Sequence, residues 1–327
     1  MNLLLAGDFN DAERGEWAAA LRQALPGHRL CLARGEVPDD RIDAAIVANP
    51  PAGSLAGLPA LRLIQSLWAG VDRLLADATL PAAVPIARMV DPAMTAAMAE
   101  TALWATLALH RGYFTYAAQQ RAGRWLQLAQ RRADEVPVLV LGLGQMGCAV
   151  AQRLVQQGYP VAAWRRGAAP ADAAVAAPGR EPDLAAHDGV VVHTGPAALA
   201  PALARAQVLV NLLPLTPDTR GLINARLLAA LPRGAGLVNL ARGAHVVDAD
   251  LLAALASGQV GQAVLDVFHT EPLPAGHPFW QHPRVALLPH AAALTDARSA
   301  AAVVAHNIAA LASGAPLQHA VRRGAGY

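Results

Sequence analysis

The chain has 327 residues, of which 54% are hydrophobic and 15% charged, so we expect a globular protein, most simply of two domains. Its formal net charge of +2 and its scattered arginines do not favour nucleic acid binding. The chain contains no lysine, which excludes lysine Schiff-base chemistry and a P-loop lysine.

No apolar run approaches the roughly 20 residues that a membrane span needs. The opening MNLLLAG is shorter than the apolar region of a signal peptide. The two cysteines, Cys31 and Cys148, lie far apart and predict no disulfide framework. We therefore expect a cytoplasmic protein.

Residues 1–91 alternate short apolar runs with helical patterns, which predicts a parallel sheet with helices on both faces. The expected strands are 2–6, 29–33, 44–48, 61–67 and 85–90, and the expected helix is 17–25. After Leu67 comes Trp68-Ala69-Gly70-Val71-Asp72, where backbone N–H groups opening a helix could hold a small carboxylate. An ordinary strand-to-helix turn is the alternative.

A long helix is expected from Pro92 to Arg111, with Asp91 or Thr95 as its N-cap. Apolar residues lie nearly all round this helix, which predicts burial between domains or in a subunit interface. Residues 112–136 then mix aromatic side chains with arginine and glutamine. We interpret this stretch as a connecting arm that packs against a second subunit, with nucleic acid binding as the weaker alternative.

The stretch from Pro137 to Val150 is the most informative. A buried strand, 137–141, precedes G-x-G-x-x-G at Gly142, Gly144 and Gly147; a helix from Cys148 to Gln157 and a second strand, 160–164, follow. The first glycine permits a tight turn, the second lets the backbone approach a pyrophosphate at the helix N-terminus, and the third allows close helix–strand packing. This order predicts a dinucleotide site.

The end of the second strand indicates which dinucleotide is bound. An NAD enzyme places an acidic residue there, about 20 residues past the fingerprint, to bind the ribose 2′-hydroxyl. Here the chain reads Trp164-Arg165-Arg166, with no acid nearby in sequence. Two arginines suit a 2′-phosphate, so NADP(H) is favoured and NAD(H) stays possible; a solvated arginine pair on a turn is the alternative.

Beyond an expected loop at 167–183, further strands are predicted at 189–193, 208–213, 237–240, 263–268 and 285–288. Asp248 is expected to cap a helix ending at Gly258, and Thr295 a closing helix ending at Gly314.

Three polar groups follow strands of this unit: Arg242, Glu271 and His290. Ligands of open parallel sheets bind outside the carboxyl ends of the strands. An arginine fork can hold a carboxylate, and a carboxylate beside an imidazole favours the protonated general acid. The set suits reduction of a 2-oxo acid, although each residue taken singly could be structural.

A metal site is the alternative for the same region. His269-Thr270-Glu271 matches the H-x-E half of the zinc deaminase signature, and His277 and His282 lie close in sequence. The P-C-x-x-C half is missing and the two cysteines cannot supply it. We therefore expect no metal.

The sequence resembles the D-isomer-specific 2-hydroxyacid dehydrogenase family, and within it the glyoxylate/hydroxypyruvate reductase A type. The resemblance spans the chain and is weakest in 1–60 and 167–205. The stretches that carry it are SLWAGVD (66–72), LGLGQMG (141–147), NLLPLTPDTRGLIN (211–224), NLARGAHVVDADLLAALASGQV (239–260), VLDVFHTEPLP (264–274), WQHPRVALLPHAAA (280–293) and the terminal Gly-Tyr.

The resemblance implies roles for individual residues. Arg242 matches the substrate-binding arginine, Glu271 the acid paired with the histidine, and His290 the proton donor. Asp266 would face the nicotinamide carboxamide, and Trp68, where many relatives carry a smaller residue, bears on pocket size. The substrate carboxylate would be bound by Ala69, Gly70 and Val71. The residues expected to bind the cofactor are Gly142, Gly144, Gln145, Met146, Gly147, Trp164, Arg165, Arg166, Leu213, Pro214, Ala241 and Asp266.

We therefore expect two doubly wound α/β domains, Rossmann- or flavodoxin-like, with a cleft between them. Residues 1–98 with 292–327 would form the substrate domain and 99–291 the NAD(P)-binding domain. The expected function is NADPH-dependent reduction of glyoxylate or hydroxypyruvate to glycolate or D-glycerate by a homodimer that binds neither nucleic acid nor membrane. The alternatives are a reductase for another 2-oxo acid and a dinucleotide-sensing regulatory protein of the same fold.

Overall fold

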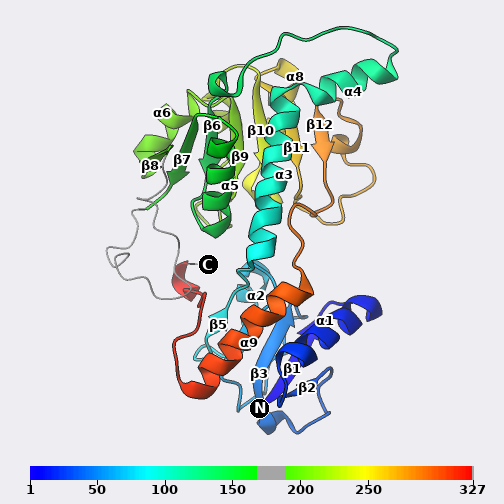
Figure 1. Ribbon diagram of the computed structural model, residues 1–327, viewed down its shortest axis with the longest axis vertical. Coiled ribbons are helices and arrows are strands. Elements are labelled where there is room, and N and C mark those ends of the chain that lie inside the picture. Colours follow the sequence, from blue (N-terminus) through cyan, green and yellow to red (C-terminus); the bar gives the residue numbers. More distant parts are fainter. Residues whose placement is uncertain (168–188, 326–327) are drawn as a thin grey trace. The chain divides into compact units, whose positions relative to one another are not determined.

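The computed structural model describes residues 1–167 and 189–325, which divide into two compact units. One unit comprises 1–94 and the chain from 295 onward; the other comprises 95–167 and 189–294. Each unit contains one all-parallel sheet, which confirms the predicted α/β class (Figure 1). Most of the loop expected at 167–183 lies outside the described residues. Within the described ranges, no helix is long and apolar enough to cross a membrane.

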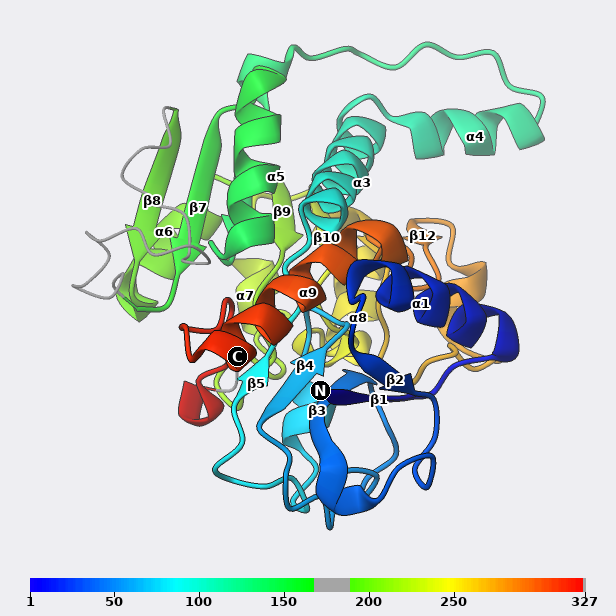
Figure 2. The same ribbon diagram turned by 60° about the horizontal axis from the view of Figure 1, so that its bottom comes forward.

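The smaller unit has five strands in the order β2-β1-β3-β4-β5, and all five predicted strands are present. They are β1 (Asn2–Gly7), β2 (Arg29–Cys31), β3 (Ile42–Ala48), β4 (Leu63–Ser66) and β5 (Ile86–Ala87). Its helices are α1 (Asp11–Ala24), α2 (Asp72–Leu75) and α9 (Ala297–Ser313). Figure 2 shows α9 running beside α1 over the same sheet.

Two helix starts in this unit differ from the prediction. Helix α1 begins at Asp11, because Asn10 accepts the N–H of Glu13 and the Glu13 carboxylate accepts the N–H of Asn10. Helix α9 is capped by Asp296, whose Oδ1 accepts the Arg298 N–H at 2.9 Å, so the expected Thr295 cap is wrong. The helix ends as predicted at Gly314, which has a φ of 72°.

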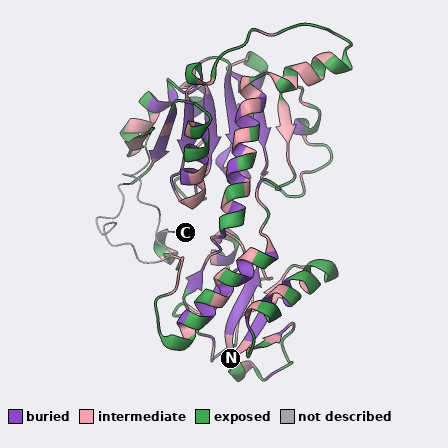
Figure 3. Ribbon diagram, in the orientation of Figure 1, coloured by how far each residue is buried: buried purple, intermediate pink, exposed green. Residues whose placement is uncertain are grey.

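Helix α3 (Pro92–His110) begins where the sequence predicts. Of the two candidate caps, Asp91 is correct, since its carboxylate accepts the N–H groups of Ala93 and Met94 at 3.2 and 3.3 Å. Gly112, with a φ of 68°, ends this helix, and a second helix, α4 (Tyr113–Arg121), occupies the first part of the expected arm. Figure 3 shows that α4 and the chain after it are largely exposed.

The larger unit has seven parallel strands in the order β12-β11-β10-β9-β6-β7-β8. They are β6 (Val138–Leu141), β7 (Val161–Arg165), β8 (Val190–Thr194), β9 (Val208–Asn211), β10 (Ala235–Asn239), β11 (Val260–Leu265) and β12 (Val285–Leu287). Its other helices are α5 (Gln145–Gln156), α6 (Leu199–Leu203), α7 (Ala225–Ala229) and α8 (Asp248–Ser257). Short 3₁₀ turns lie at Asp39–Arg41, Ala133–Glu135, Pro196–Ala198, Gly243–His245, Pro278–Gln281 and Arg323–Ala325.

Side chains of these strands alternate between two cores, because successive residues of a strand point to opposite faces. Val138 and Val140 of β6 pack with α3 and α5, whereas Leu139 and Leu141 pack with α6, α7 and α8. Both faces are thus apolar, which explains why the sequence shows continuous hydrophobic runs instead of alternation.

The chain winds outward from β6 through β7 to β8 and then returns to β9 on the other side of β6. The turn after β6 and the turn after β9 therefore leave the sheet side by side, at the point where ligands of doubly wound sheets bind. Strands β9 and β11 end at Asn211 and Leu265, earlier than the predicted 213 and 268. The residues that follow these two strands are thereby released into loops at this edge.

Candidate active site

The three glycines of the fingerprint occupy three different environments. A Cβ on Gly142, whose φ is 97°, would lie 2.7 Å from the carbonyl oxygen of Leu212, and one on Gly147 would lie 1.9 Å from the carbonyl oxygen of Gly142. A Cβ on Gly144 would have no atom within 4 Å. Two glycines are thus required by packing, and the third leaves open space at the start of α5, which fits a bound pyrophosphate.

Helix α5 begins at Gln145, directly after Gly144, three residues earlier than expected. Gln145, Met146 and Gly147 therefore form its first turn, where intrahelical bonds leave backbone N–H groups unused. No side chain caps this end. The positive end of the helix and its amides point toward the open space beside Gly144, as anion binding requires.

The residues at the end of β7 serve different purposes. The Trp164 side chain is buried in the core, its Nε1 donates to the Gly195 carbonyl at 2.9 Å, and its own carbonyl accepts the Gly142 N–H at 2.9 Å. Trp164 thus supports the fingerprint turn through its backbone. Arg165 lies at the strand end, with Nε donating to Thr194 at 3.3 Å.

Arg166 has an acidic partner that the sequence reading missed. Its Nη1 pairs with the Asp218 carboxylate and lies 3.5 Å from Oγ1 of Thr216. No acid lies near Arg166 in sequence, but the loop after β9 brings Asp218 to this strand end in the fold. The Asp218 side chain is 71% exposed, so this is a surface ion pair that an incoming phosphate can displace at small cost.

Arg242 follows β10 and precedes a 3₁₀ turn. The turn passes close to the chain after β11: a Cβ on Gly243 would lie 2.0 Å from the backbone of Phe268. Glycine at this position therefore brings the chain that carries Arg242 against the chain leading to Glu271. The Arg242 side chain is half-buried, and its Nη1 donates to the Ala241 carbonyl at 2.7 Å.

Glu271 and His290 form the predicted pair. Nδ1 of His290 lies 2.7 Å from Oε2 of Glu271, and Oε1 of Glu271 accepts the Phe268 N–H at 2.9 Å. Nε2 of His290 has no hydrogen-bond partner in the described part of the chain, and the imidazole is 51% exposed. The free nitrogen can therefore exchange a proton with a bound molecule.

Asp266 shapes the backbone of this histidine. His290 has a φ of 54°, in the left-handed region that non-glycine residues seldom adopt. Its N–H donates to the Asp266 carbonyl at 2.8 Å, and the N–H groups of Ala291 and Ala292 donate to Oδ1 of Asp266 at 2.7 and 3.1 Å. Burial raises the pKa of Asp266, against the lowering effect of these two amides. Its expected contact with a nicotinamide stays a prediction.

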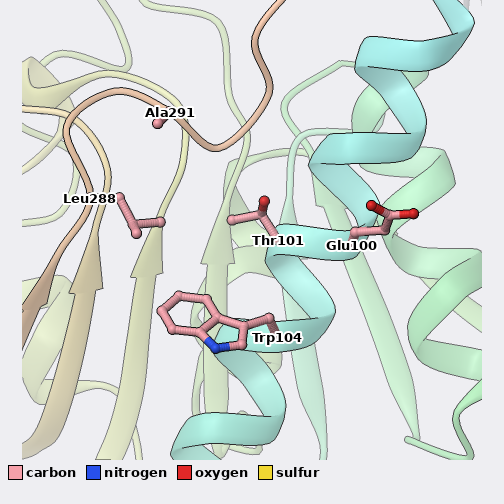
Figure 4. Close-up of a pocket in the computed structure, with 5 residues that line it drawn as sticks. All are labelled: Glu100, Thr101, Trp104, Leu288 and Ala291. Carbon is pink, nitrogen blue, oxygen red and sulfur yellow. The ribbon is translucent and has the colours of Figure 1, made fainter.

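A pocket of about 330 Å³ adjoins this loop in the larger unit. Figure 4 shows the lining residues, with Thr101 and Trp104 of α3 on the side of Leu288 and Ala291, while the Glu100 side chain points the other way. Thr101 connects α3 to the loop after His290, because its hydroxyl donates to the Ala292 carbonyl at 2.7 Å. None of the predicted site residues lines this pocket.

The residues expected to bind the substrate carboxylate belong to the smaller unit. Ala69, Gly70 and Val71 follow β4, but α2 is only four residues long, so its dipole is weaker than the sequence pattern predicts. Any carboxylate would be held here by individual N–H groups. The Trp68 ring packs edge-on against Trp17 at 6.2 Å, within the same unit.

Asp248 does not cap α8 as expected. It is the first helical residue, and its carboxylate lies 3.7 Å from Nε2 of His269 and 3.4 Å from Nε2 of His277. Across residues 1–167 and 189–325, no three His, Cys, Asp or Glu side chains are arranged to hold a metal ion. Nε2 of His269 is instead 2.7 Å from the Val246 carbonyl.

Three buried polar side chains at the strand ends were missed by the sequence reading: Asn211, Asn239 and His245. They connect Leu213, Pro214 and Ala241, expected at the cofactor, with Arg242. The available signal was a polar residue closing an apolar strand, V-L-V-N in β9 and G-L-V-N in β10.

A doubly wound sheet with a glycine turn at its switch point is typical of proteins that bind a dinucleotide, and the His290–Glu271 pair, which has the chemistry of an acid–base group, follows strands of the same sheet. Together they define the class of dinucleotide-dependent oxidoreductases. Residues 103–292 match the NAD-binding domain of D-isomer specific 2-hydroxyacid dehydrogenases, and the chain belongs to this family of NAD(P)-dependent enzymes.

Several relatives are similar along nearly the whole chain. Glyoxylate/hydroxypyruvate reductase A of Serratia proteamaculans is 41% identical over 321 residues, which cover 96% of each chain. A family member from Xanthobacter autotrophicus, solved with NADPH and MES, is 38% identical with a TM-score of 0.90, covering 100% of this chain and 99% of that one. The NADPH-dependent glyoxylate/hydroxypyruvate reductase of Sinorhizobium meliloti, solved with NADP and sulfate, is 35% identical with a TM-score of 0.86 at the same coverage.

Proposed function

We propose that the protein reduces glyoxylate or hydroxypyruvate to glycolate or D-glycerate with NADPH. The observation that carries the proposal is the His290–Glu271 pair at the carboxyl ends of β11 and β12, in the sheet that bears the glycine fingerprint. The names of the Serratia and Sinorhizobium relatives support the choice of substrate. Bound NADPH would supply the hydride that adds to the carbonyl carbon.

His290 supplies the proton that balances this hydride. The Glu271 carboxylate accepts a hydrogen bond from Nδ1 of the half-exposed ring, which holds the imidazole in place and makes Nε2 the nitrogen that can donate to the substrate. As the carbonyl oxygen becomes an alkoxide, Nε2 transfers its proton to that oxygen. The Phe268 N–H holds the carboxylate in place throughout.

Arg242 binds the substrate. Its guanidinium presents parallel N–H groups that can engage the carboxylate and the carbonyl oxygen together. The bond from Nη1 to the neighbouring Ala241 carbonyl limits its rotation. The backbone amides of Ala69, Gly70 and Val71 are further ligands for the substrate carboxylate.

The cofactor is held by three groups of residues. The amides of Gly144, Gln145, Met146 and Gly147 hold the pyrophosphate, Arg165 and Arg166 the 2′-phosphate, and the turn containing Leu213 and Pro214 lies beside them. Two arginines at the end of β7, and NADPH or NADP in the related structures, support NADP(H) over NAD(H), which can still bind without the phosphate contact.

The working enzyme is a cytoplasmic homodimer. In the described ranges four of the large exposed hydrophobic side chains fall within one stretch, Trp104, Tyr113, Trp125 and Leu126. Exposed side chains of this kind, here on α3, on α4 and in the chain after α4, are typical of a surface that a second subunit covers. Neither Cys31 nor Cys148 forms a disulfide, which fits a reducing compartment.

The test is NADPH oxidation, followed at 340 nm, with glyoxylate, hydroxypyruvate, pyruvate and 2-oxobutyrate. We expect turnover with the first two and little with the others. His290→Ala, which lacks the proton donor, is the matched control and should bind NADPH but turn over poorly. Tight NADPH binding by the wild type without turnover of any oxo acid would instead support a dinucleotide-sensing protein.

A further inference from the structure

Asn211, Asn239 and His245 are all fully buried, beneath the turns that follow β9 and β10. Buried polar side chains are costly unless each donor and acceptor is satisfied. The bonds among these three therefore determine how each is oriented.

Backbone partners fix both amide groups. Oδ1 of Asn211 accepts the Leu213 N–H at 3.3 Å, so its Nδ2 is the atom that donates to Oδ1 of Asn239 at 2.9 Å. Oδ1 of Asn239 also accepts the Ala241 N–H at 3.3 Å, and its Nδ2 donates to the Arg242 carbonyl at 3.0 Å. Neither amide can be rotated by 180° without setting donor against donor.

The same logic fixes the proton on His245. Nε2 lies 3.3 Å from the Pro214 carbonyl, which can only accept, so Nε2 carries the hydrogen. Nδ1 lies 3.0 Å from Nδ2 of Asn211, which can only donate, so Nδ1 carries no hydrogen and accepts this bond. The network is satisfied by one state alone, the neutral ring with its hydrogen on Nε2.

We propose that His245 is a positioning residue that connects the cofactor turn to the substrate arginine. One ring nitrogen holds the turn at Pro214, where Thr219 also donates at 2.8 Å. The other holds Asn211, which holds Asn239, which fixes the carbonyl of Arg242. The roles of Pro214 and Arg242 rest on the proposed function, whereas the protonation state of His245 does not.

Two substitutions remove the two hydrogen bonds of the His245 ring separately. In His245→Asn the amide oxygen can take the place of Nδ1 and accept from Asn211, while the donor to Pro214 is lost. In His245→Gln the longer side chain places an amide N–H near the Nε2 position, while the acceptor for Asn211 is lost. Each variant thus removes one bond and keeps the other.

We expect the kinetic constants to split accordingly. His245→Asn should weaken NADPH binding about fivefold and leave the KM for the oxo acid nearly unchanged at saturating cofactor. His245→Gln should raise the KM for the oxo acid about five- to tenfold and leave the NADPH dissociation constant nearly unchanged. Equal losses of both constants in both variants would overturn the proposal, because a merely structural histidine predicts no split.

Thr106→Val is the matched control. Thr106 is also fully buried in the larger unit and donates to the Ala102 carbonyl at 2.8 Å within α3. Its loss should lower Tm without altering either constant.

A second measurement needs no variant. Nitrogen-15 NMR of the wild-type protein should show His245 neutral, with its hydrogen on Nε2, and hydrogen on Nδ1 would overturn the proposal. Both this measurement and NADPH binding can be made even if the wild type reduces no oxo acid. Failure of the proposed function is therefore distinguishable from failure of this inference.

Discussion

Nδ1 of His290 lies 2.7 Å from Oε2 of Glu271, while the other oxygen of that carboxylate accepts the Phe268 N–H at 2.9 Å. The Phe268 N–H therefore holds the carboxylate in place independently of the ring, so the carboxylate can fix the orientation of the imidazole. The histidine backbone is anchored separately, through the Asp266 carbonyl. Two independent supports thus hold His290, which is the preorganisation that its proposed role as general acid would need.

Replacing Glu271 by Gln tests the charge of this pair while keeping its shape. A neutral amide oxygen accepts a weaker hydrogen bond from Nδ1–H of His290 than a carboxylate does. We therefore expect kcat for reduction to fall about tenfold in Glu271→Gln, with an NADPH affinity close to that of the wild type. The measurements are kcat for reduction of the oxo acid and the dissociation constant of NADPH. An unchanged kcat would show that the pair is structural.

Replacing Arg242 by Lys preserves the charge but not the fork. An ammonium group cannot hold a carboxylate and a carbonyl oxygen in one plane. We expect kcat/KM for the oxo acid to fall about 30-fold or more, equivalent to about 2 kcal/mol. NADPH affinity, measured by fluorescence quenching, should stay close to that of the wild type. Near-normal kinetics would assign Arg242 a structural role.

Arg165 and Arg166 should set cofactor preference. The double replacement by Ala should raise the KM for NADPH far more than that for NADH, because only NADPH carries the 2′-phosphate. Equal effects on the two cofactors would contradict the assignment.

Asp218 provides a finer test of the same site. Its carboxylate pairs with Arg166 and must be displaced before that arginine can bind a phosphate. Asp218→Asn should therefore tighten NADPH binding by up to a few-fold, a size set by the small free energy of an exposed ion pair, and leave NADH binding unchanged. Weaker NADPH binding in this variant would show that Asp218 assists the cofactor.

The strands and the fold class were predictable because both sheets are buried on both faces and read as apolar runs. The ends of individual helices and strands were harder to predict from the sequence. Helix α1 starts six residues before the expected Trp17, since the Asn10–Glu13 capping box extends it into a polar stretch. Strand β11 ends at Leu265, before the apolar Val267 and Phe268, because the buried Asp266 uses its backbone and carboxylate to hold the loop of His290.

The candidate site likewise has a part that the sequence predicts and a part that it does not. Glycines and single polar residues after strands are visible in the sequence, since the rule that ligands bind at carboxyl ends needs only the order of elements. The contact of Arg166 with Asp218 joins positions 52 residues apart, and that of Asn211 with His245 joins positions 34 apart. Such pairs depend on the order of strands in the sheet, which no local pattern contains.

The arm gives a prediction about assembly. Trp125 is 97% exposed, and burying an indole against a second subunit would contribute strongly to an interface. We expect Trp125→Ser to shift the proposed dimer toward monomer in sedimentation velocity at micromolar concentration. Trp280→Ser is the control, because Trp280 is also exposed but lies outside the arm. A wild-type monomer, or equal shifts for both variants, would contradict the proposed interface.

The last prediction concerns Asp266 and the pH dependence of stability. Burial raises the pKa of its carboxyl above the usual value of about 3.9, so over the range between the two values the folded chain binds more protons than the unfolded chain. Stability must then fall as pH rises through that range. The side chain in Asp266→Asn does not titrate, and it keeps an oxygen that can accept from the Ala291 and Ala292 amides. The Tm of this variant minus the Tm of the wild type should therefore increase as pH rises from acid to neutral.

Asp296 provides the control, because its pKa is shifted in the opposite direction. Hydrogen bonds from Arg298 lower the pKa of Asp296 to about 2, so this carboxylate favours the folded state above the unfolded pKa of about 3.9 and loses that effect as pH falls toward 2. Asp296→Asn should therefore lose Tm relative to the wild type above pH 4 and approach it in acid. The two variants thus predict Tm differences of opposite sign at neutral pH, both vanishing in acid. A difference for Asp266→Asn that stays constant with pH would mean that its carboxylate titrates alike in the folded and unfolded chains.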